Sequence, residues 1–320
     1  MAWFSRKKDA GPPDEAPDPA LTMMTVGQVA RLRALVRQAF AERGIEVSVA
    51  EDYVRSEDGY VFGLWNVAAT CHGDERGPAA WPELVGRHVE LMLKTTTADP
   101  FDVMSRDDVL AAVHVRLMEK VAAMDLDGFA YAQEIVPGVM RVLAVDTPDV
   151  VVVPPLDRLT AHAGLDTVWD AGWRNLRKVM DRDDLRVHGV DLDGHPSAFQ
   201  VMQSASVFTA SLALLLPEVV QRLLPGQALS ERGAFVGIPN RNELVIHVIG
   251  DPERAMIALT ALPRFIVSGF DDAPGPISPH TFWWHGDRFD PITTIEDKAL
   301  TVRISHELSD VLGLDAPGNG

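Results

Sequence analysis

RGAFVGIPNRNELVIHVI, from Arg232 to Ile249, is the stretch that decides the fold. Two apolar runs, Phe235 to Ile238 and Leu244 to Ile249, flank the segment Pro239-Asn240-Arg241-Asn242. Proline ends a strand because it lacks a backbone N–H, and asparagine tolerates the left-handed backbone of a tight turn. The stretch therefore predicts a β-hairpin. Because both runs are apolar on both strand faces, we expect other layers to cover the hairpin on both sides.

Further strand-like runs are paired around turn residues along the rest of the chain. The pairs are 46–54 with 60–70, 129–136 with 139–145, 185–188 with 199–203, and 281–284 with 288–292. Apolar residues at helical spacing lie between these pairs. The expected helices begin at 25, 81, 105, 155, 166 and 251, and one more covers 208–224. Because antiparallel hairpins and helices interleave without a strand–helix–strand rhythm, we predict an α+β fold. A repeated αββα unit is a further hypothesis.

Two of these expectations place particular residues. The helix that begins at Ser105 is expected to continue through Val109, Val113, Leu117 and Val121. The expected strand 60–70 puts the following residues at a strand end or in a loop.

The first residues of the chain differ in composition from the rest. Residues 1–22 are rich in Pro, Ala and Asp and have no periodicity, so we expect a disordered acidic tail in which Met1 to Leu21 is unpacked. We expect an N-terminal αββα lobe over 23–100 and a central and C-terminal α+β domain over 101–316.

Charge and cysteine content narrow the classes of function. The formal net charge of the 320 residues is -17, which argues against a nucleic-acid partner and an anionic membrane partner. The single cysteine, Cys71, suits a reducing compartment because it allows no intramolecular disulfide. No secretory signal is present, and the longest apolar run, Leu212 to Leu216, is far shorter than the roughly 20 residues that span a bilayer. We predict a cytoplasmic protein.

Six short stretches follow one another along the chain after the tail. They are Gly63-Leu64-Trp65-Asn66, Ile135-Val136-Pro137, Ala144-Val145-Asp146, Trp173-Arg174-Asn175-Leu176, Ala210-Ser211, and Val236 to Leu244. In this order they resemble the YtpQ-like family of uncharacterised bacterial proteins, a domain of unknown function. The Pro-Asn-Arg-x-x-Leu hairpin and the Trp-Arg-Asn-Leu stretch are the most specific parts. The resemblance implies a soluble α+β protein and supplies no catalytic residue, and the acidic Pro-rich tail departs from the family pattern.

Residues with catalytic or metal-binding chemistry are few. Cys71 and His72 are sequence neighbours, and neighbouring side chains seldom face each other, so we predict that Cys71 is not a nucleophile. His280 and His285, with Asp287 and Asp290, have a spacing that a metal could use, but strand alternation favours turn and rim roles. No P-loop, GxGxxG, HExxH, GxSxG or CxxC pattern occurs. We therefore predict no catalytic residue, no metal and no cofactor.

The remaining candidates are residues that could bind a ligand or a partner. Trp283 and Trp284 belong to an aromatic cluster beside His280, and the alternative, packing of the C-terminal hairpin, is favoured. Arg241, near Glu243, could bind a carboxylate or phosphate, but in an acid-rich chain a structural ion pair that pins the turn is favoured.

These observations favour a non-catalytic cytoplasmic protein that binds a protein partner or a small ligand. The alternative is an enzyme of unassigned class, with hydrolysis the expected reaction, whose residues converge only in the fold. The sequence does not identify the partner, the ligand or the oligomeric state.

Overall fold

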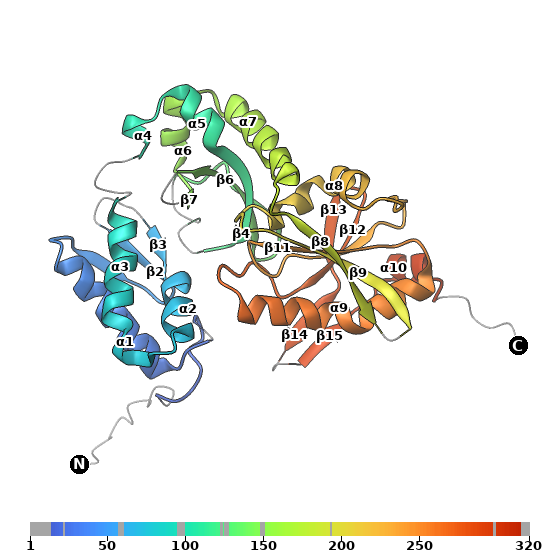
Figure 1. Cartoon of the computed structure of the whole chain (residues 1–320), viewed down its shortest axis with the longest axis horizontal. Coiled ribbons are helices and arrows are strands. Elements are labelled where there is room, and N and C mark those ends of the chain that lie inside the picture. Colours follow the sequence, from blue (N-terminus) through green and yellow to red (C-terminus); the bar gives the residue numbers. More distant parts are fainter. Residues whose placement is uncertain are drawn as a thin grey trace, which may run out of the picture. The chain divides into compact units, whose positions relative to one another are not determined.

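The computed structural model describes residues 14–21, 23–56, 61–94, 100–121, 124, 128–147, 151–192, 194–296 and 299–314. Contacts between Cα atoms divide the chain into two compact units, Met1–Asp99 and Pro100–Gly320. The fold is α+β, with antiparallel sheets and helices in both units (Figure 1). In the described part of the chain, no helix combines the length and apolar character needed to cross a membrane.

The first unit is a small antiparallel sheet with helices. Its elements are α1 (Val26–Ala41), β1 (Val47–Val49), β2 (Tyr53–Ser56), β3 (Val61–Gly63), α2 (Trp65–Gly73), the 3-10 helix η1 (Gly77–Ala79) and α3 (Trp81–Lys94). The strands follow the order β1-β2-β3. Thr25 caps α1 and exchanges hydrogen bonds with Gln28, which confirms the helix start that the sequence predicts.

The expectation of an unpacked tail is wrong for Asp14–Leu21. The Asp18 backbone N–H donates to the carbonyl of Met24 at 2.9 Å, and the Asp18 carboxylate accepts from the backbone N–H of Leu21 at 3.0 Å. Leu21 is 0% exposed and belongs to the core of the first unit. The amino-acid composition did not predict this packing, because only one buried leucine, Leu21, and one turn-forming aspartate, Asp18, fix the segment. Residues 1–13 and 22 lie outside the described residues.

The strand expected over 60–70 ends early. β3 stops at Gly63, and the next residues form α2. The buried side chains of α2, Val67, Ala68 and Cys71, share one face at helical spacing. Cys71 therefore lies on a helix. The expectation that it lies at a strand end or in a loop is wrong.

The second unit contains two main sheets and the helices that cover them. Its first elements are α4 (Pro100–Val103), α5 (Arg106–Ala112), β4 (Val113–Glu119), β5 (Gln133–Val136), β6 (Val139–Asp146), β7 (Val151–Val152), α6 (Leu156–His162), α7 (Leu165–Lys178) and η3 (Val179–Asp181). These are followed by β8 (Arg186–Leu192), β9 (His195–Gln203), η4 (Ala210–Leu215), α8 (Leu216–Leu223), β10 (Ala234–Gly237) and β11 (Glu243–Val248). The last are α9 (Pro252–Asp272), β12 (Thr281–His285), β13 (Arg288–Pro291), β14 (Thr293–Glu296), β15 (Ala299–Val302) and α10 (His306–Leu312).

The hairpin predicted from the sequence forms the middle of the larger sheet. β10 and β11 pair antiparallel, and the sheet has the order β13-β12-β10-β11-β9-β8. Residues 233–240 are all buried. The hairpins predicted over 185–203 and 281–292 are confirmed as β8–β9 and β12–β13.

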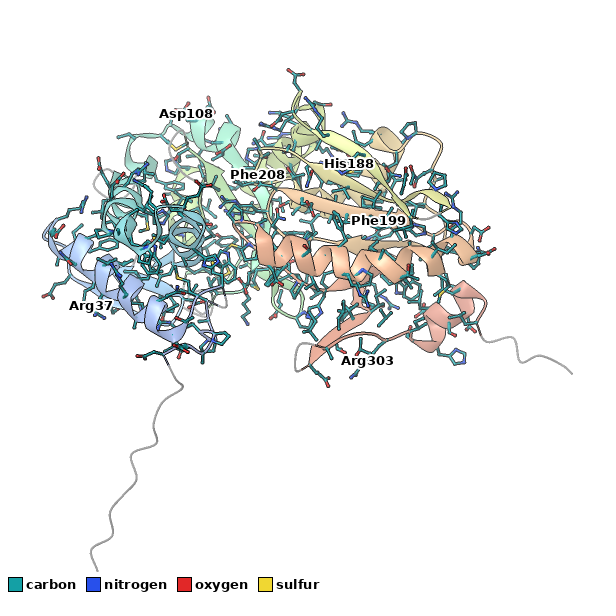
Figure 2. The ribbon with its side chains drawn as sticks, turned by 60° about the horizontal axis from the view of Figure 1, so that its bottom comes forward. Arg37, Asp108, His188, Phe199, Phe208 and Arg303 are labelled. Carbon is teal, nitrogen blue, oxygen red and sulfur yellow. The ribbon has the colours of Figure 1, made fainter. Side chains whose placement is uncertain are left out.

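Both faces of this sheet are covered. On one face Phe235 and Val245 pack with α9, which lies along the sheet (Figure 1), and Phe199 stands above α9 in Figure 2. On the other face Val236 and Ile246 pack in a core that includes Phe208 and residues of η4, α8 and β4. The sheet is therefore an interior layer, as the apolar strands of the hairpin require.

The helix predicted to run from Ser105 through Val121 ends at Ala112, so the prediction is wrong for the residues that follow. α5 ends there, and β4 begins at Val113 and pairs along its whole length with β6. A spacing of four residues suits both a helix and one face of a strand, since it is a multiple of two. The intervening residues decide between the two, because burial alternates residue by residue along β4.

We predict that Ile246→Ala lowers the free energy of unfolding by about 2–5 kcal/mol, the range for truncating a buried aliphatic side chain. Ile246 is 0% exposed and pairs with Val236 on one side and Gln200 on the other. Urea denaturation measures the change. Val302→Ala is the control: Val302 is 37% exposed on β15, and its truncation should change stability by only about 0.5 kcal/mol. Equal effects of the two substitutions would show that the core is misplaced.

Candidate functional site

The turn between β10 and β11 is held by its asparagines. The Asn240 side-chain amide donates to the carbonyl of Gly269 in α9 at 3.1 Å. The Asn242 side-chain amide donates to the carbonyls of Ser204 at 3.2 Å and Ser206 at 3.1 Å. Both asparagines therefore act in the scaffold and connect the turn to neighbouring segments.

Arg241 lies between these two asparagines, and its backbone is held from two sides. Its N–H donates to the carbonyl of Gly275 at 2.9 Å, and its carbonyl accepts from the N–H of Ala210 at 3.2 Å. Its side chain packs against Gly275, where a β-carbon would lie 2.6 Å from Cδ of Arg241. Gly275 also has a φ of +70°, a left-handed backbone conformation that favours glycine at this position.

Arg116 reaches the same place from β4. Side chains alternate along a strand, so Arg116 and His114 lie on the face opposite Val115. Val115 faces α7, because a β-carbon on Gly172 of α7 would lie 3.2 Å from Val115 Cγ2. The His114 ring stacks on Phe208 with 4.3 Å between centroids, and Phe208 lies beside β4 in Figure 2.

Hydrogen bonds to the start of η4 bring the backbones of Arg116 and Arg241 to the same place. The N–H of Leu117, next to Arg116, donates to the Ser211 hydroxyl at 2.9 Å, and the N–H of Ala210, next to Ser211, donates to the carbonyl of Arg241 at 3.2 Å. The pKa of Arg116 is lowered to about 10, mainly by burial and to a smaller extent by the positive charge of Arg241, whereas the carboxylate of Asp146, at the end of β6, acts to raise it. Burial also lowers the pKa of Arg241. Two like charges therefore lie in a partly buried region, where each is less well hydrated than at an open surface.

Neither guanidinium has a partner among the residues that the structure describes. Nε of Arg116 and Nε of Arg241 are both buried without a hydrogen bond, and neither side chain forms an ion pair. Both residues keep part of their surface exposed. The expectation that Arg241 pairs with an acidic neighbour and pins the turn is wrong, because backbone and asparagine hydrogen bonds hold the turn instead. We call Arg116 and Arg241 the arginine pair.

Glu243 is close to Arg241 in sequence but is bound elsewhere. Its carboxylate accepts a hydrogen bond from the side-chain amide of Gln203, and its other oxygen, Oε1, is buried without a partner. Burial raises the pKa of Glu243, and the amide of Gln203 and the charge of His188 lower it. Glu243 therefore does not neutralise the arginine pair.

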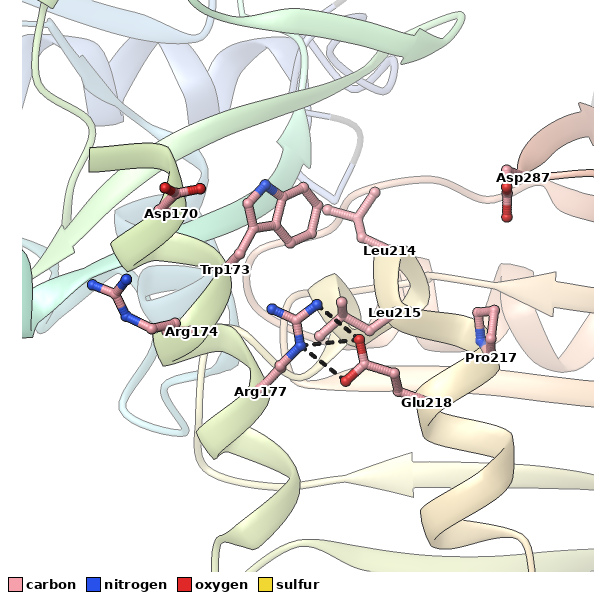
Figure 3. Close-up of a pocket in the computed structure, with 9 residues that line it drawn as sticks. All are labelled: Asp170, Trp173, Arg174, Arg177, Leu214, Leu215, Pro217, Glu218 and Asp287. Atoms are coloured by element: carbon pink, nitrogen blue, oxygen red, sulfur yellow. Dashed lines mark hydrogen bonds and ion pairs between the residues drawn. The ribbon is translucent and has the colours of Figure 1, made fainter. Parts of the chain in front are cut away.

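A pocket of about 590 Å³ lies elsewhere in the second unit (Figure 3). It is lined by Asp170, Trp173, Arg174, Arg177, Leu214, Leu215, Pro217, Glu218 and Asp287. The Arg177 guanidinium donates to both carboxylate oxygens of Glu218 at 2.8–2.9 Å. Arg177 and Glu218 therefore neutralise each other. A charged ligand would gain less from binding beside this ion pair than from binding beside the unpaired arginines.

The Trp-Arg-Asn-Leu stretch is divided between this pocket and the scaffold. Trp173 and Arg174 line the pocket. Asn175 is buried and donates to the backbone carbonyls of Leu110 at 2.9 Å and Val113 at 2.7 Å. Asn175 thereby fastens α7 to the junction where α5 becomes β4.

A groove of about 920 Å³ in the first unit contains Arg37 and Arg55. Both arginines are exposed, and Arg37 lies on the surface of α1 in Figure 2. Exposed charges are screened by water, so this groove is a weaker candidate for specific recognition.

Trp283 and Trp284, in the β12–β13 hairpin, do not form an exposed aromatic surface. Trp283 is 2% exposed and packs on the α9 side of the sheet, whereas Trp284 is 9% exposed and packs on the opposite side. Trp283 also donates its indole N–H to the carbonyl of Arg232 at 2.9 Å. The alternative that the sequence favoured, packing of the hairpin, describes both residues.

The two histidines of this hairpin are in different surroundings. Burial lowers the pKa of His280, and a hydrogen bond with the backbone of Thr293 raises it; His280 Nδ1 also lies 3.4 Å from the Thr293 hydroxyl. His285 Nε2 lies 2.7 Å from a carboxylate oxygen of Asp290, and its ring stacks on Trp283. Within the described ranges, no three His, Cys, Asp or Glu side chains are grouped to hold a metal ion.

Sequence reasoning found Arg241 but missed Arg116. Arg116 was assigned to a helix, where no relation to the hairpin turn could be foreseen. The alternation Val113-His114-Val115-Arg116-Leu117 was the available signal, since it describes a strand with one apolar face and one that carries His and Arg.

Comparison with models of protein families, with curated proteins and with solved structures found no match to this chain.

We predict that Cys71 reacts with a thiol reagent at pH 7.5 much more slowly than a model thiol. Burial, with a smaller contribution from the charge of Asp74, raises the pKa of Cys71 to about 11, so little thiolate is present. Stopped-flow labelling of the folded protein measures the rate, and labelling in urea gives the control rate for the exposed thiol. Fast labelling of the folded protein would contradict this placement.

We predict that Glu243→Gln raises the free energy of unfolding, relative to that of the wild type, more at pH 8 than at pH 4. The folded pKa of Glu243 lies above its unfolded value, so its stabilising contribution is complete below the unfolded pKa and is lost as pH rises through the folded pKa. Glutamine keeps the shape and does not titrate. Urea denaturation at both pH values gives the difference. Glu296→Gln, at an exposed position, should show no such dependence, and an equal response of both variants would refute the prediction.

Proposed function

We propose that this protein is a non-catalytic binding protein and that the arginine pair is its site for a small anionic ligand. The observation that carries the proposal is that two arginines from distant segments approach the start of η4, each with a buried Nε that has no hydrogen-bond partner, and that neither forms an ion pair with a described carboxylate.

The energetic argument concerns the cost of such an arrangement. Removing a charge from water is unfavourable unless a partner replaces the lost hydration. Two neighbouring positive charges repel, which adds to that cost. A bound anion would supply both the missing hydrogen-bond acceptors and the missing negative charge. Binding would then recover free energy that the unliganded protein lacks.

The overall charge of the chain supports a specific site. At a net charge of -17, the average surface repels anions. An anion is therefore bound only where local positive charge outweighs that field, and the arginine pair supplies it. Part of each arginine remains exposed, which leaves an approach for a small ligand.

The cellular location and the family are part of the proposal. A single buried thiol suits a reducing compartment, which supports the cytoplasm. The order of short motifs supports kinship with the YtpQ-like family.

The residues considered for catalysis come from both units of the chain. Cys71 and His72 belong to the first unit, whereas Arg241, Glu243 and His280 belong to the second, so no single element contains all of them.

We predict that Arg116→Met raises the melting temperature of the unliganded protein. Methionine fills a similar volume without a charge, so it removes the desolvation cost and the repulsion from Arg241. The same variant should lose most of the stabilisation that sulfate gives the wild type, which is about 2.7 kcal/mol when the ligand is at 100 times its Kd. Differential scanning calorimetry with and without sulfate at constant ionic strength measures both effects.

Arg303→Met is the matched control. Arg303 is an exposed arginine on an ion pair with Glu296, and it lies at the surface in Figure 2. Its replacement should leave the sulfate effect unchanged. If sulfate stabilises the wild type and Arg116→Met equally, or stabilises neither, the arginine pair is not an anion site.

A further inference from the structure

We propose that the ligand of the arginine pair carries a phosphate group in its dianionic form, as in a phosphate monoester. This inference rests on the proposed function, because it specifies the chemical class of the anion that Arg116 and Arg241 bind.

The charges match. The two guanidiniums carry two positive charges, and no carboxylate forms an ion pair with either one in the described part of the chain. A phosphate monoester carries a charge of about -1.5 to -2 near neutral pH. A monocarboxylate carries a single charge and would leave one arginine uncompensated. Asp146 approaches from β6 but makes no ion pair with Arg116, so the positive excess remains.

The numbers of donors and acceptors match as well. A guanidinium has five N–H donors, so the pair offers about ten, and neither side chain donates a hydrogen bond to any described residue. A carboxylate has about four lone-pair sites and is filled by one bidentate arginine. A phosphate presents three strong acceptor oxygens, enough to engage both guanidiniums.

The origin of the two arginines points the same way. Arg116 belongs to β4 of one sheet, and Arg241 belongs to the turn between β10 and β11 of the other. A planar carboxylate is recognised best in its own plane, whereas a tetrahedral phosphate accepts hydrogen bonds from several directions. Two forks that come from separate sheets suit the tetrahedral group.

The titratable groups around the pair must be separated from those of the ligand. They are His114 on β4, Asp146 at the end of β6, Glu243 on β11, and Lys178 at the end of α7. Any titration of these groups alters the binding of every anion. A comparison of two anions at each pH removes that contribution.

Isothermal titration calorimetry of the full chain with methyl phosphate, sulfate and acetate tests the inference. At pH 8 methyl phosphate should bind at least about tenfold more tightly than acetate. From pH 8 to pH 5 its affinity relative to sulfate should fall about tenfold, because the second pKa of a phosphate monoester is about 6 and sulfate stays a dianion. Arg241→Lys keeps the charge without the fork and should weaken methyl phosphate binding about tenfold.

The outcomes separate the two proposals. Acetate binding as tight as methyl phosphate binding, or a methyl phosphate to sulfate ratio that does not change with pH, overturns the phosphate assignment and leaves an anion site. Binding of no anion, or equal binding by the wild type and Arg116→Met, overturns the anion site itself. Retained folding of each variant is checked by its urea unfolding transition.

Discussion

The pairing of β10 with β11 and β12 is the constraint on which the second unit depends. All three strands are apolar on both faces, so the sheet is stable only between two layers. α9 supplies one layer, and it can approach β10 closely because Gly237 has no side chain where Ile266 packs. The other layer combines η4 and α8 with β4 and its neighbours. The positions of the remaining elements follow from this need for cover.

The same arrangement explains how a costly arginine pair can persist. The turn between β10 and β11 is held by backbone hydrogen bonds to Gly275 and Ala210 and by the side chains of Asn240 and Asn242. Arg241 is therefore not required to stabilise the turn. The packing of the sheet offsets the unfavourable free energy of the two unpaired charges. Such compensation by the surrounding structure is common at functional sites.

The sequence correctly predicted the elements whose residue spacing fits only one type of secondary structure. It failed where the spacing fits both a helix and a strand. Two apolar runs around a polar, asparagine-rich turn indicated the central hairpin, and Asp251 followed by Pro252 indicated the start of α9. The four-residue spacing from Val109 to Val121 suited helix and strand alike, and the strand prevailed because β6 offered a partner for β4. Pairing over such a distance leaves no mark within a local window of sequence.

The sequence by itself determined the α+β class, the central hairpin and Arg241 at its tip, because these depend on local periodicity and on the backbone preferences of proline and asparagine. Only the tertiary structure decided that Arg116 and Arg241 approach the same end of η4, that neither arginine forms an ion pair in the described part of the chain, and that Trp283 and Trp284 are buried on opposite faces. The physical reason is that desolvation and charge pairing depend on which distant segments pack together. That packing is a property of the whole sheet and its covering layers, and no single stretch of residues encodes it.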